Sequence, residues 1–257
     1  MSAAGLAGAG AAGLFAGLLS GVFGIGGGIV LVPLLALLLG LSQHEAQGMT
    51  LAVLVLPIGL PAVLAYRRHA PIRWPLVLAL VTGFVTGVVG GARAANSLPD
   101  RPLRLVFVLF LLAVAIHGWR VSSLPQGGLP PRPRASAWHG LWIGLAGGAL
   151  SGLLGIGGGI VMVPLLVHAA RLGRLEAQGT SLAAMLPPVG LPGVLVYAAA
   201  SGGLPWTPLA TVALAFGAGA LAGARLATRA SAFALGRAFS LFVLVVALAL
   251  AGTTLRR

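Results

Sequence analysis

The sequence predicts an all-α polytopic membrane protein built from two homologous repeats, and three observations carry this prediction. Of its 257 residues, 58% are hydrophobic and only 7% are charged, whereas a soluble domain has about 25% charged residues. Apolar runs long enough to cross a bilayer follow one another along the whole chain. The motif Gly-Ile-Gly-Gly-Gly occurs inside one such run at Gly24–Gly28 and again at Gly155–Gly159.

The charged residues fit a membrane protein better than a nucleic-acid-binding protein. The net charge of +13 comes from sixteen basic residues, all arginines, and three acids. The arginines lie singly or in pairs between apolar runs, with no basic face and no interleaved aromatics, so we expect no nucleic acid as a partner. The chain has no cysteine, which excludes disulfides and thiolate metal sites. The first run lacks the basic segment of a signal peptide, and we expect it to be retained in the membrane.

A shift of 131 positions superimposes the two halves of the sequence. It pairs the following residues: Ser20 with Ser151, Pro33 with Pro164, Glu45 with Glu176, Gln47 with Gln178, Pro57 with Pro188, and Tyr66 with Tyr197. After one inserted residue, Trp74 pairs with Trp206. We therefore interpret residues 1–124 and 135–257 as two membrane repeats. Residues 125–134, rich in Pro, Gly and Arg, are expected to form an exposed linker.

Each half contains four apolar elements. They span roughly 5–40, 45–66, 74–95 and 102–119 in the first half, and 136–170, 175–200, 205–228 and 231–252 in the second. The second, third and fourth elements have lengths that suit a spanning helix of about 20 residues. The first element is too long, because a helix of its length would extend about 54 Å against a hydrocarbon core of about 30 Å. Glycine weakens a helix, so we expect this element to break at Gly24–Gly28 and at Gly155–Gly159.

The broken first element could form either a bent crossing or a re-entrant hairpin, and the arginines favour the hairpin. With eight full crossings, eight arginines fall on each side of the membrane. With re-entrant first elements, eleven fall on one side and five on the other, which agrees with the positive-inside rule. Three crossings then remain per half, so the second repeat is expected to be inverted.

The second element of each half is also interrupted, by Pro57–Pro61 and by Pro187–Pro192. Proline removes a backbone donor and clashes with the preceding turn, and a membrane tolerates such a break where protein or a water-filled cavity meets the freed groups. A simple packing kink is the alternative explanation.

The glycine turn leads into an apolar half-helix that begins near Ile29 and near Ile160. The start of a helix offers free N–H groups and about half a positive charge, which suits an anion. We expect the two turns to face each other and to build one transport site. Close helix packing through small residues is the alternative reading. No Gly-Lys-Ser/Thr follows the motif, so it is not a nucleotide-binding loop.

Polar residues cluster at the start of each second element. The first half reads Glu-Ala-Gln-Gly-Met-Thr from Glu45 to Thr50, and the second reads Glu-Ala-Gln-Gly-Thr-Ser from Glu176 to Ser181. Hydroxyl and amide groups donate hydrogen bonds to an oxyanion without holding it tightly. For the two glutamates we favour helix capping, with proton coupling as the alternative.

The acidic residues and histidines of the sequence give little support to a catalytic function. The three acids never pair within one element, and Asp100 lies in a Pro-Asp-Arg-Pro segment where we expect a turn. The histidines occur singly, so we expect no metal and no cofactor. His44 and His168, beside the loops near the glutamates, could take protons, although an interfacial histidine is more common.

The sequence resembles the sulfite exporter TauE/SafE family of membrane transporters. The residues that carry the resemblance are Ser20–Gly28 with Pro33, Ser151–Gly159 with Pro164, Ala177–Leu182, and the two Gly-Ala-Arg segments at 91–93 and 223–225. The resemblance implies a permease of the plasma (inner) membrane for sulfite, sulfonates or related small organic anions, with export and proton linkage. The first half departs from the pattern, since Met49-Thr50 stands where the second half has Thr180-Ser181.

The resulting expectation is a multi-pass secondary transporter whose partners are a small anion and the lipid bilayer. A passive anion channel and a non-transporting membrane scaffold subunit remain as alternatives. The expected substrate-binding residues are Ser20, Gly24, Gly26, Gly27, Gly28, Gln47, Thr50, Ser151, Gly155, Gly157, Gly158, Gly159, Gln178, Thr180 and Ser181.

Overall fold

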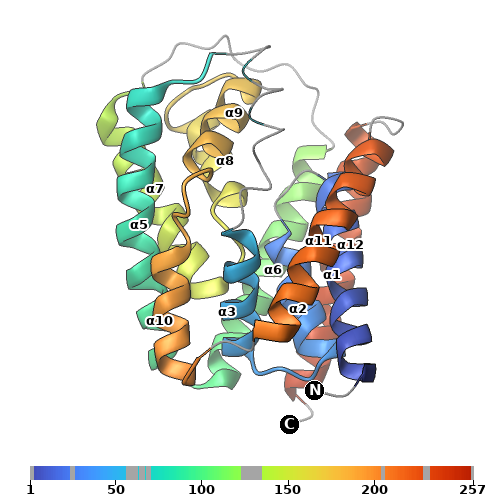
Figure 1. Cartoon of the computed structure of the whole chain (residues 1–257). Coiled ribbons are helices and arrows are strands. Elements are labelled where there is room, and N and C mark those ends of the chain that lie inside the picture. Colours follow the sequence, from blue (N-terminus) through green and yellow to red (C-terminus); the bar gives the residue numbers. More distant parts are fainter. Residues whose placement is uncertain are drawn as a thin grey trace. The chain divides into compact units, whose positions relative to one another are not determined.

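The computed structural model describes residues 3–23, 27–55, 63, 67, 71–122, 135–203, 206–227 and 232–255, and the regular structure in these ranges is helical throughout (Figure 1). The first half contains α1 (Ala3–Phe23), α2 (Gly28–Leu38), α3 (Gln43–Leu54), α5 (Trp74–Ser97) and α6 (Asp100–Ser122). The second half contains α7 (Ala137–Leu154), α8 (Gly159–His168), α9 (Arg174–Ala184), α10 (Leu191–Ser201), α11 (Trp206–Ala227) and α12 (Ala232–Leu255). The all-α fold expected from the composition is confirmed, while the linker at 125–134 lies outside the described residues.

The long first element of each half is divided at its glycines. In the first half α1 ends at Phe23 and α2 begins at Gly28, and in the second half α7 ends at Leu154 and α8 begins at Gly159. The second element is divided as well in the second half, where α9 ends at Ala184 and α10 begins at Leu191 across the proline-rich segment. Its counterpart at Pro57–Pro61 lies outside the described residues.

Helix α2 runs back along α1. A Cβ atom added at Gly8, near the start of α1, would lie 3.2 Å from Cδ2 of Leu39, the residue that ends α2. A Cβ added at Gly27, where α2 starts, would lie 3.3 Å from the Cβ of Ser20 near the end of α1. The two helices therefore form an antiparallel hairpin. The re-entrant interpretation requires this geometry and remains a prediction about the membrane.

The helices gather into two compact units that do not coincide with the two halves of the sequence. Unit 1 comprises residues 1–53, 97–126 and 204–257, and unit 2 comprises residues 54–96 and 127–203. Unit 1 therefore contains α1, α2, α6, α11, α12 and nearly all of α3, whereas unit 2 contains α5 and α7 to α10. Each unit combines helices from both halves.

Glycines bring the helices of one pair together in each unit. In unit 1, a Cβ at Gly13 or Gly17 of α1 would overlap the α11 backbone at Val212 or Phe216. Small residues allow such close backbone contact in membrane helices. In unit 2, α5 and α7 pack in the same way, and the contacts correspond under the offsets of 131 and 132: Gly13–Val212 with Gly144–Leu80, and Gly17–Phe216 with Gly148–Phe84. The first element of each half thus packs against the third element of the other half.

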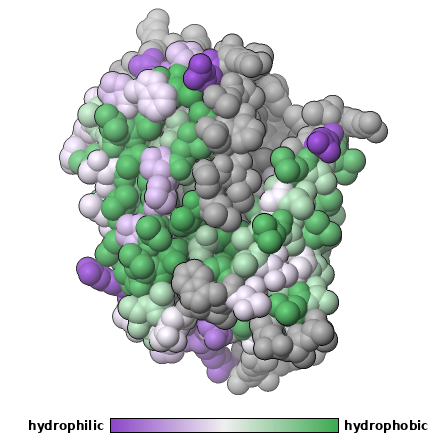
Figure 2. All heavy atoms as spheres, in the orientation of Figure 1, coloured by the Kyte–Doolittle hydropathy of each residue, from purple (hydrophilic) through white to green (hydrophobic). Residues whose placement is uncertain are grey.

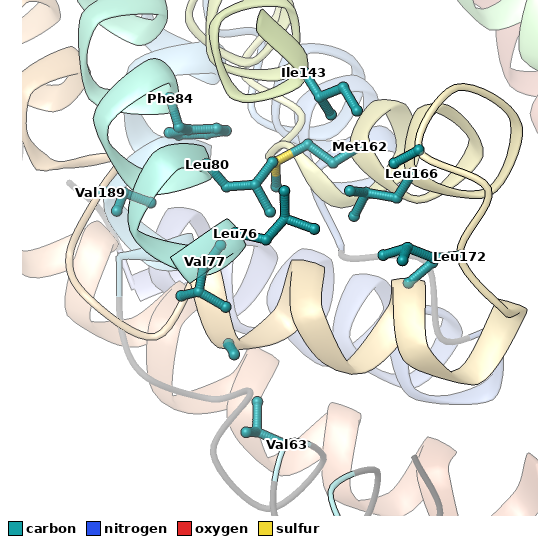
Figure 3. Close-up of a cluster of buried hydrophobic side chains, with 14 of the residues drawn as sticks. Val63, Leu76, Val77, Leu80, Phe84, Ile143, Met162, Leu166, Leu172 and Val189 are labelled. Atoms are coloured by element: carbon teal, nitrogen blue, oxygen red, sulfur yellow. The ribbon is translucent and has the colours of Figure 1, made fainter. Parts of the chain in front are cut away.

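The core of unit 2 lies between α5, α7, α8 and α9 (Figure 3). Leu80 and Phe84 project from α5 toward Met162 and Leu166 of α8, with Ile143 of α7 beside them. This cluster fixes the position of α8, the short helix that follows the glycine turn.

Four described helices are long and apolar enough to cross a membrane, within Gly5–Val22, Trp74–Ser97, Asp100–Arg120 and Gly236–Thr254. Helix α1 is one of these four although it ends at a predicted break, whereas α2, α8 and α10, which follow the breaks, have only 10 or 11 residues. Large apolar side chains are exposed on several helices, among them Leu78 on α5 and Leu214 on α11, which are 67% and 77% exposed. Figure 2 shows the molecule in the orientation of Figure 1, and apolar residues cover most of the described part of the face that it presents. Such a surface suits lipid, and the chain is a multi-pass membrane protein.

Candidate functional site

The turn between α7 and α8 in unit 2 is built by glycines in a left-handed conformation. Gly155 ends α7 with φ 71° and donates its N–H to the carbonyl of Ser151 at 2.7 Å. Gly157 has φ 75°. Residues with a Cβ rarely adopt this conformation, so glycine lets the chain reverse within a few residues and enter α8 at once.

The helices that follow the glycine turns start without a cap. Neither α2 nor α8 has a side-chain hydrogen bond at its N-cap or an acid in its first turn. In α2 this start is buried, since Ile29 is 1% exposed. The first N–H groups of a helix have no partner within it, and the helix dipole makes this end positive. The arrangement offers donors and partial positive charge to an anion.

Two glycines of the predicted site serve packing. A Cβ at Gly27 would overlap the ring of Phe216, and a Cβ at Gly158 would overlap the ring of Phe84. Gly159 is different, because only Sδ of Met185 would come within 4 Å of its Cβ, at 3.8 Å. Packing therefore explains Gly27 and Gly158, whereas it leaves Gly159 unexplained.

Four of the predicted hydroxyl residues are buried without a hydrogen bond. Thr50 of α3, Ser151 of α7, and Thr180 and Ser181 of α9 are each at most 1% exposed, and their hydroxyl oxygens have no hydrogen-bond partner in the described part of the chain. An unpaired buried polar group costs about 1–3 kcal/mol, so native proteins seldom leave one without a reason. We call these four residues the orphan hydroxyls.

Other helical hydroxyls satisfy themselves by donating to a carbonyl one turn earlier. The examples are Thr82 to Leu78, Ser201 to Tyr197, Thr211 to Thr207, Ser240 to Gly236 and Thr254 to Leu250, at 2.7–3.0 Å. Such local bonds are the usual solution for serine and threonine inside helices. Burial does not prevent this bond, because Ser240 and Thr254 are only 2% and 3% exposed. The orphan hydroxyls are therefore oriented differently from the rest.

In unit 2, the two helices α7 and α9 bring orphan hydroxyls close to the glycine turn. Ser151 lies one helical turn before Gly155, and Ser181 lies one turn before Met185, to whose N–H its carbonyl is bonded at 3.2 Å. Met185 in turn touches the glycine turn, with Cε 3.5 Å from the Cβ position of Gly157. Ser151 is therefore about one turn of helix, roughly 5 Å along the axis, from Gly155 of the glycine turn. Ser181 is about the same distance from Met185, which contacts the glycine turn.

A protein-family comparison identifies the family of the chain. The family model "Sulfite exporter TauE/SafE" matches residues 9–250. The chain belongs to the TauE/SafE family. Its curated relatives carry the name probable membrane transporter protein. One from Xylella fastidiosa is 29% identical over 89% of this chain and 88% of its own length. One from Haemophilus influenzae is 28% identical over 92% and 94%, and one from Bacillus subtilis is 28% identical over 60% and 64%. No solved structure gives a match.

The remaining predicted residues of this TauE/SafE protein that the structure describes lie on α1, α2, α3 and α9. Gln47 of α3 is buried, and Gln178 of α9 is half-buried. Ser20 is half-buried beside Gly27, and Gly28 is buried in the first turn of α2. The residues Gly24 and Gly26 lie outside the described residues.

The two glutamates have structural partners. Glu45 forms a capping box with Ser42, because its Oε2 accepts bonds from both the N–H and the hydroxyl of Ser42 at 2.9 Å, and Ser42 Oγ accepts the N–H of Glu45 at 3.2 Å. Glu176 lies in the first turn of α9, where a carboxylate is favoured, and accepts a bond from Nε of Arg73. Capping is confirmed for Glu45, whereas Glu176 is held by an ion pair.

A further polar cluster, at the start of α3 and α6 in unit 1, was not anticipated from the sequence. Asp100 is the first residue of α6, and not part of a turn, because an acid is favoured at a helix start and proline is tolerated in the first turn. Its carboxylate contacts Gln43, His44 and Arg104. The sequence indicated this cluster only through the spacing of Asp100 and Arg104, which lie four residues apart as in a helical ion pair.

Proposed function

We propose that this TauE/SafE protein is a secondary transporter that exports sulfite, a sulfonate or a related small organic anion. The observation that carries the proposal is the set of orphan hydroxyls, three of which lie on the helices that form or contact the glycine turn of unit 2. Hydroxyl donors and an uncapped helix start both suit an oxyanion as the ligand. The family and the names of the relatives support transport, and the choice of anion belongs to the proposal.

Weak, neutral donors suit a transporter better than a buried arginine would. The start of a helix contributes about 0.3–2 kcal/mol to an anion, and each hydrogen bond to a charged group contributes about 1.5–3 kcal/mol. Several such contacts hold an oxyanion strongly enough to select it and weakly enough to let it leave. In this proposal Ser151, Thr180 and Ser181 donate to the anion in unit 2, and Thr50 is the corresponding donor in unit 1.

We further propose that the halves are inverted repeats with exchanged elements. The pairing of α1 with α11 and of α7 with α5 uses corresponding glycines in both units. Two interfaces built from corresponding residues are what a duplicated sequence with an odd number of crossings produces. The antiparallel course of α1 and α2 supports a re-entrant hairpin. Alternating access needs two bodies that can move, and the chain divides into two units.

Export and proton linkage rest on the resemblance to the family. Of the two glutamates considered as coupling groups, Glu45 is occupied by its capping box and Glu176 by Arg73. A proton-coupled cycle would therefore have to break one of these contacts. Efflux measured with and without an imposed pH gradient tests the linkage directly.

The proposal is tested by sulfite and sulfonate efflux from loaded proteoliposomes. A carrier gives saturable flux that falls in the double variant Thr180→Val/Ser181→Ala, while the buried control Thr254→Val keeps it. A channel gives flux that rises linearly with concentration and needs no counter-transport. A scaffold gives no flux at all, and either result would replace the proposal.

A further inference from the structure

One carboxylate joins the starts of two helices in unit 1. Oδ1 of Asp100 accepts a hydrogen bond of 2.6 Å from the backbone N–H of Gln43, the first residue of α3. The same oxygen lies 3.3 Å from Nδ1 of His44, and Oδ2 accepts a bond of 3.4 Å from Nη2 of Arg104. These residues form the Asp100 cluster, which lies where α3 and α6 begin and includes none of the orphan hydroxyls.

Two side chains of the Asp100 cluster are buried with unpaired polar atoms. Arg104 is 7% exposed, and its Nε has no hydrogen-bond partner among the described residues. Gln43 is 0% exposed, and neither Oε1 nor Nε2 of its amide is paired there. Buried polar atoms are nearly always bonded to protein, water or an ion. Three unpaired atoms on two residues that bond to the same carboxylate therefore indicate a bound group.

The charges of the Asp100 cluster favour an anion. Arg104 and Asp100 cancel each other, while the starts of α3 and α6 each add about half a positive charge. Glu45, the nearest acid on α3, bonds to Ser42. Arg101 on α6 is exposed, so solvent screens its charge.

We propose that the Asp100 cluster is a second binding site for a small oxyanion, distinct from the glycine turn. Nε of Arg104 and Nε2 of Gln43 donate to oxygens of the anion. Oε1 of Gln43 accepts from a protonated oxygen, so a singly protonated oxyanion makes the full set of bonds. Asp100 is a positioning residue that orients Arg104 through Nη2 and fixes the first turn of α3.

The test is isothermal titration of the purified full chain in detergent with sulfite, sulfate and phosphate in turn. It uses Thr180→Val/Ser181→Ala as the background, so that binding at the glycine turn does not obscure the second site. Binding should persist in this background and weaken by about tenfold or more with Arg104→Gln and with Gln43→Met. Gln43→Met keeps the volume and removes the unpaired amide, so the unfolding temperature should hold or rise. Arg101→Gln, which removes the same charge from the exposed side of α6, should leave affinity unchanged.

The outcomes separate this inference from the proposed function. Wild-type protein that binds and transports sulfite, together with a background variant that binds none of the three anions, overturns the second site and leaves transport intact. Equal weakening by Arg101→Gln and Arg104→Gln also overturns it, because the effect would then be general charge. Arg104-dependent binding in a protein without sulfite or sulfonate flux supports the second site and contradicts the proposed function. Binding of sulfite alone marks the transported anion as the ligand, whereas binding of all three marks a general oxyanion site.

Discussion

Removing a single orphan hydroxyl should weaken anion binding without weakening the fold. Thr180 is 0% exposed and its Oγ1 is unpaired among the described residues, so in the anion-free protein this group costs about 1–3 kcal/mol. Valine has nearly the same shape and no hydroxyl. With Thr180→Val, the free energy of unfolding should therefore stay constant or rise by up to about 1–3 kcal/mol. The lost hydrogen bond to the anion, about 1.5–3 kcal/mol, should raise the dissociation constant about 10- to 100-fold.

Thr254→Val provides the matched control. Thr254 is equally buried, at 3% exposed, but its hydroxyl donates to the carbonyl of Leu250 at 2.7 Å. The same substitution there removes a satisfied bond, so the free energy of unfolding should stay constant or fall by about 1 kcal/mol. Anion affinity should not change, because the hydroxyl already has a partner within the protein.

Isothermal titration with sulfite and thermal unfolding in the absence of sulfite measure the two effects. The two variants should show opposite patterns, with affinity lost and stability kept for Thr180→Val, and affinity kept for Thr254→Val. A Thr180→Val protein that unfolds more easily and binds sulfite normally would refute a role of Thr180 in anion binding. The hydroxyl would then be a structural group and not a ligand.

Three further predictions concern the turn, the cap and the topology. Gly159→Ala should leave the fold intact, because alanine favours a helix over glycine by about 1 kcal/mol. It should nevertheless reduce efflux, because the added methyl group shields the first N–H groups of α8. The control Gly90→Ala, with nothing within 4 Å of its Cβ, should keep efflux. Glu45→Gln retains a capping residue, so the pH dependence of efflux should not move, and a shifted profile would identify Glu45 as the coupling carboxylate. Single cysteines at Arg68 and Arg171 should be labelled from the same side of the membrane, and labelling from opposite sides would exclude re-entrant hairpins.

The sequence predicted the helices and their interruptions because these follow from local chemistry. The glycines at Gly155–Gly159 and the prolines at Pro187–Pro192 weaken or block a helix wherever they stand, and both breaks are present. The reason for Gly27 and Gly158 could not be predicted in the same way. It depends on the rings of Phe216 and Phe84, which belong to helices far away in the sequence.

The residue types of the candidate site were visible in the sequence, but their bonding was not. Thr50 and Thr254 are both buried helical threonines, and only the structure shows that one is unpaired while the other donates to its own helix. Gln43 and Arg104 could not be recognised from the sequence for a related reason. Each lies at the start of an element where a polar residue is ordinary, and their significance comes from burial against Asp100.

The central claim is that this protein carries a small oxyanion on its orphan hydroxyls, and counterflow of labelled sulfite tests it most directly. Proteoliposomes loaded with unlabelled sulfite are diluted into a trace of labelled sulfite, and internal label is followed with time. A carrier that binds the anion on these hydroxyls should show a transient accumulation of label above equilibrium in the wild-type protein and lose it in Thr180→Val/Ser181→Ala. Label that only equilibrates, or accumulation that survives in the double variant, would contradict it.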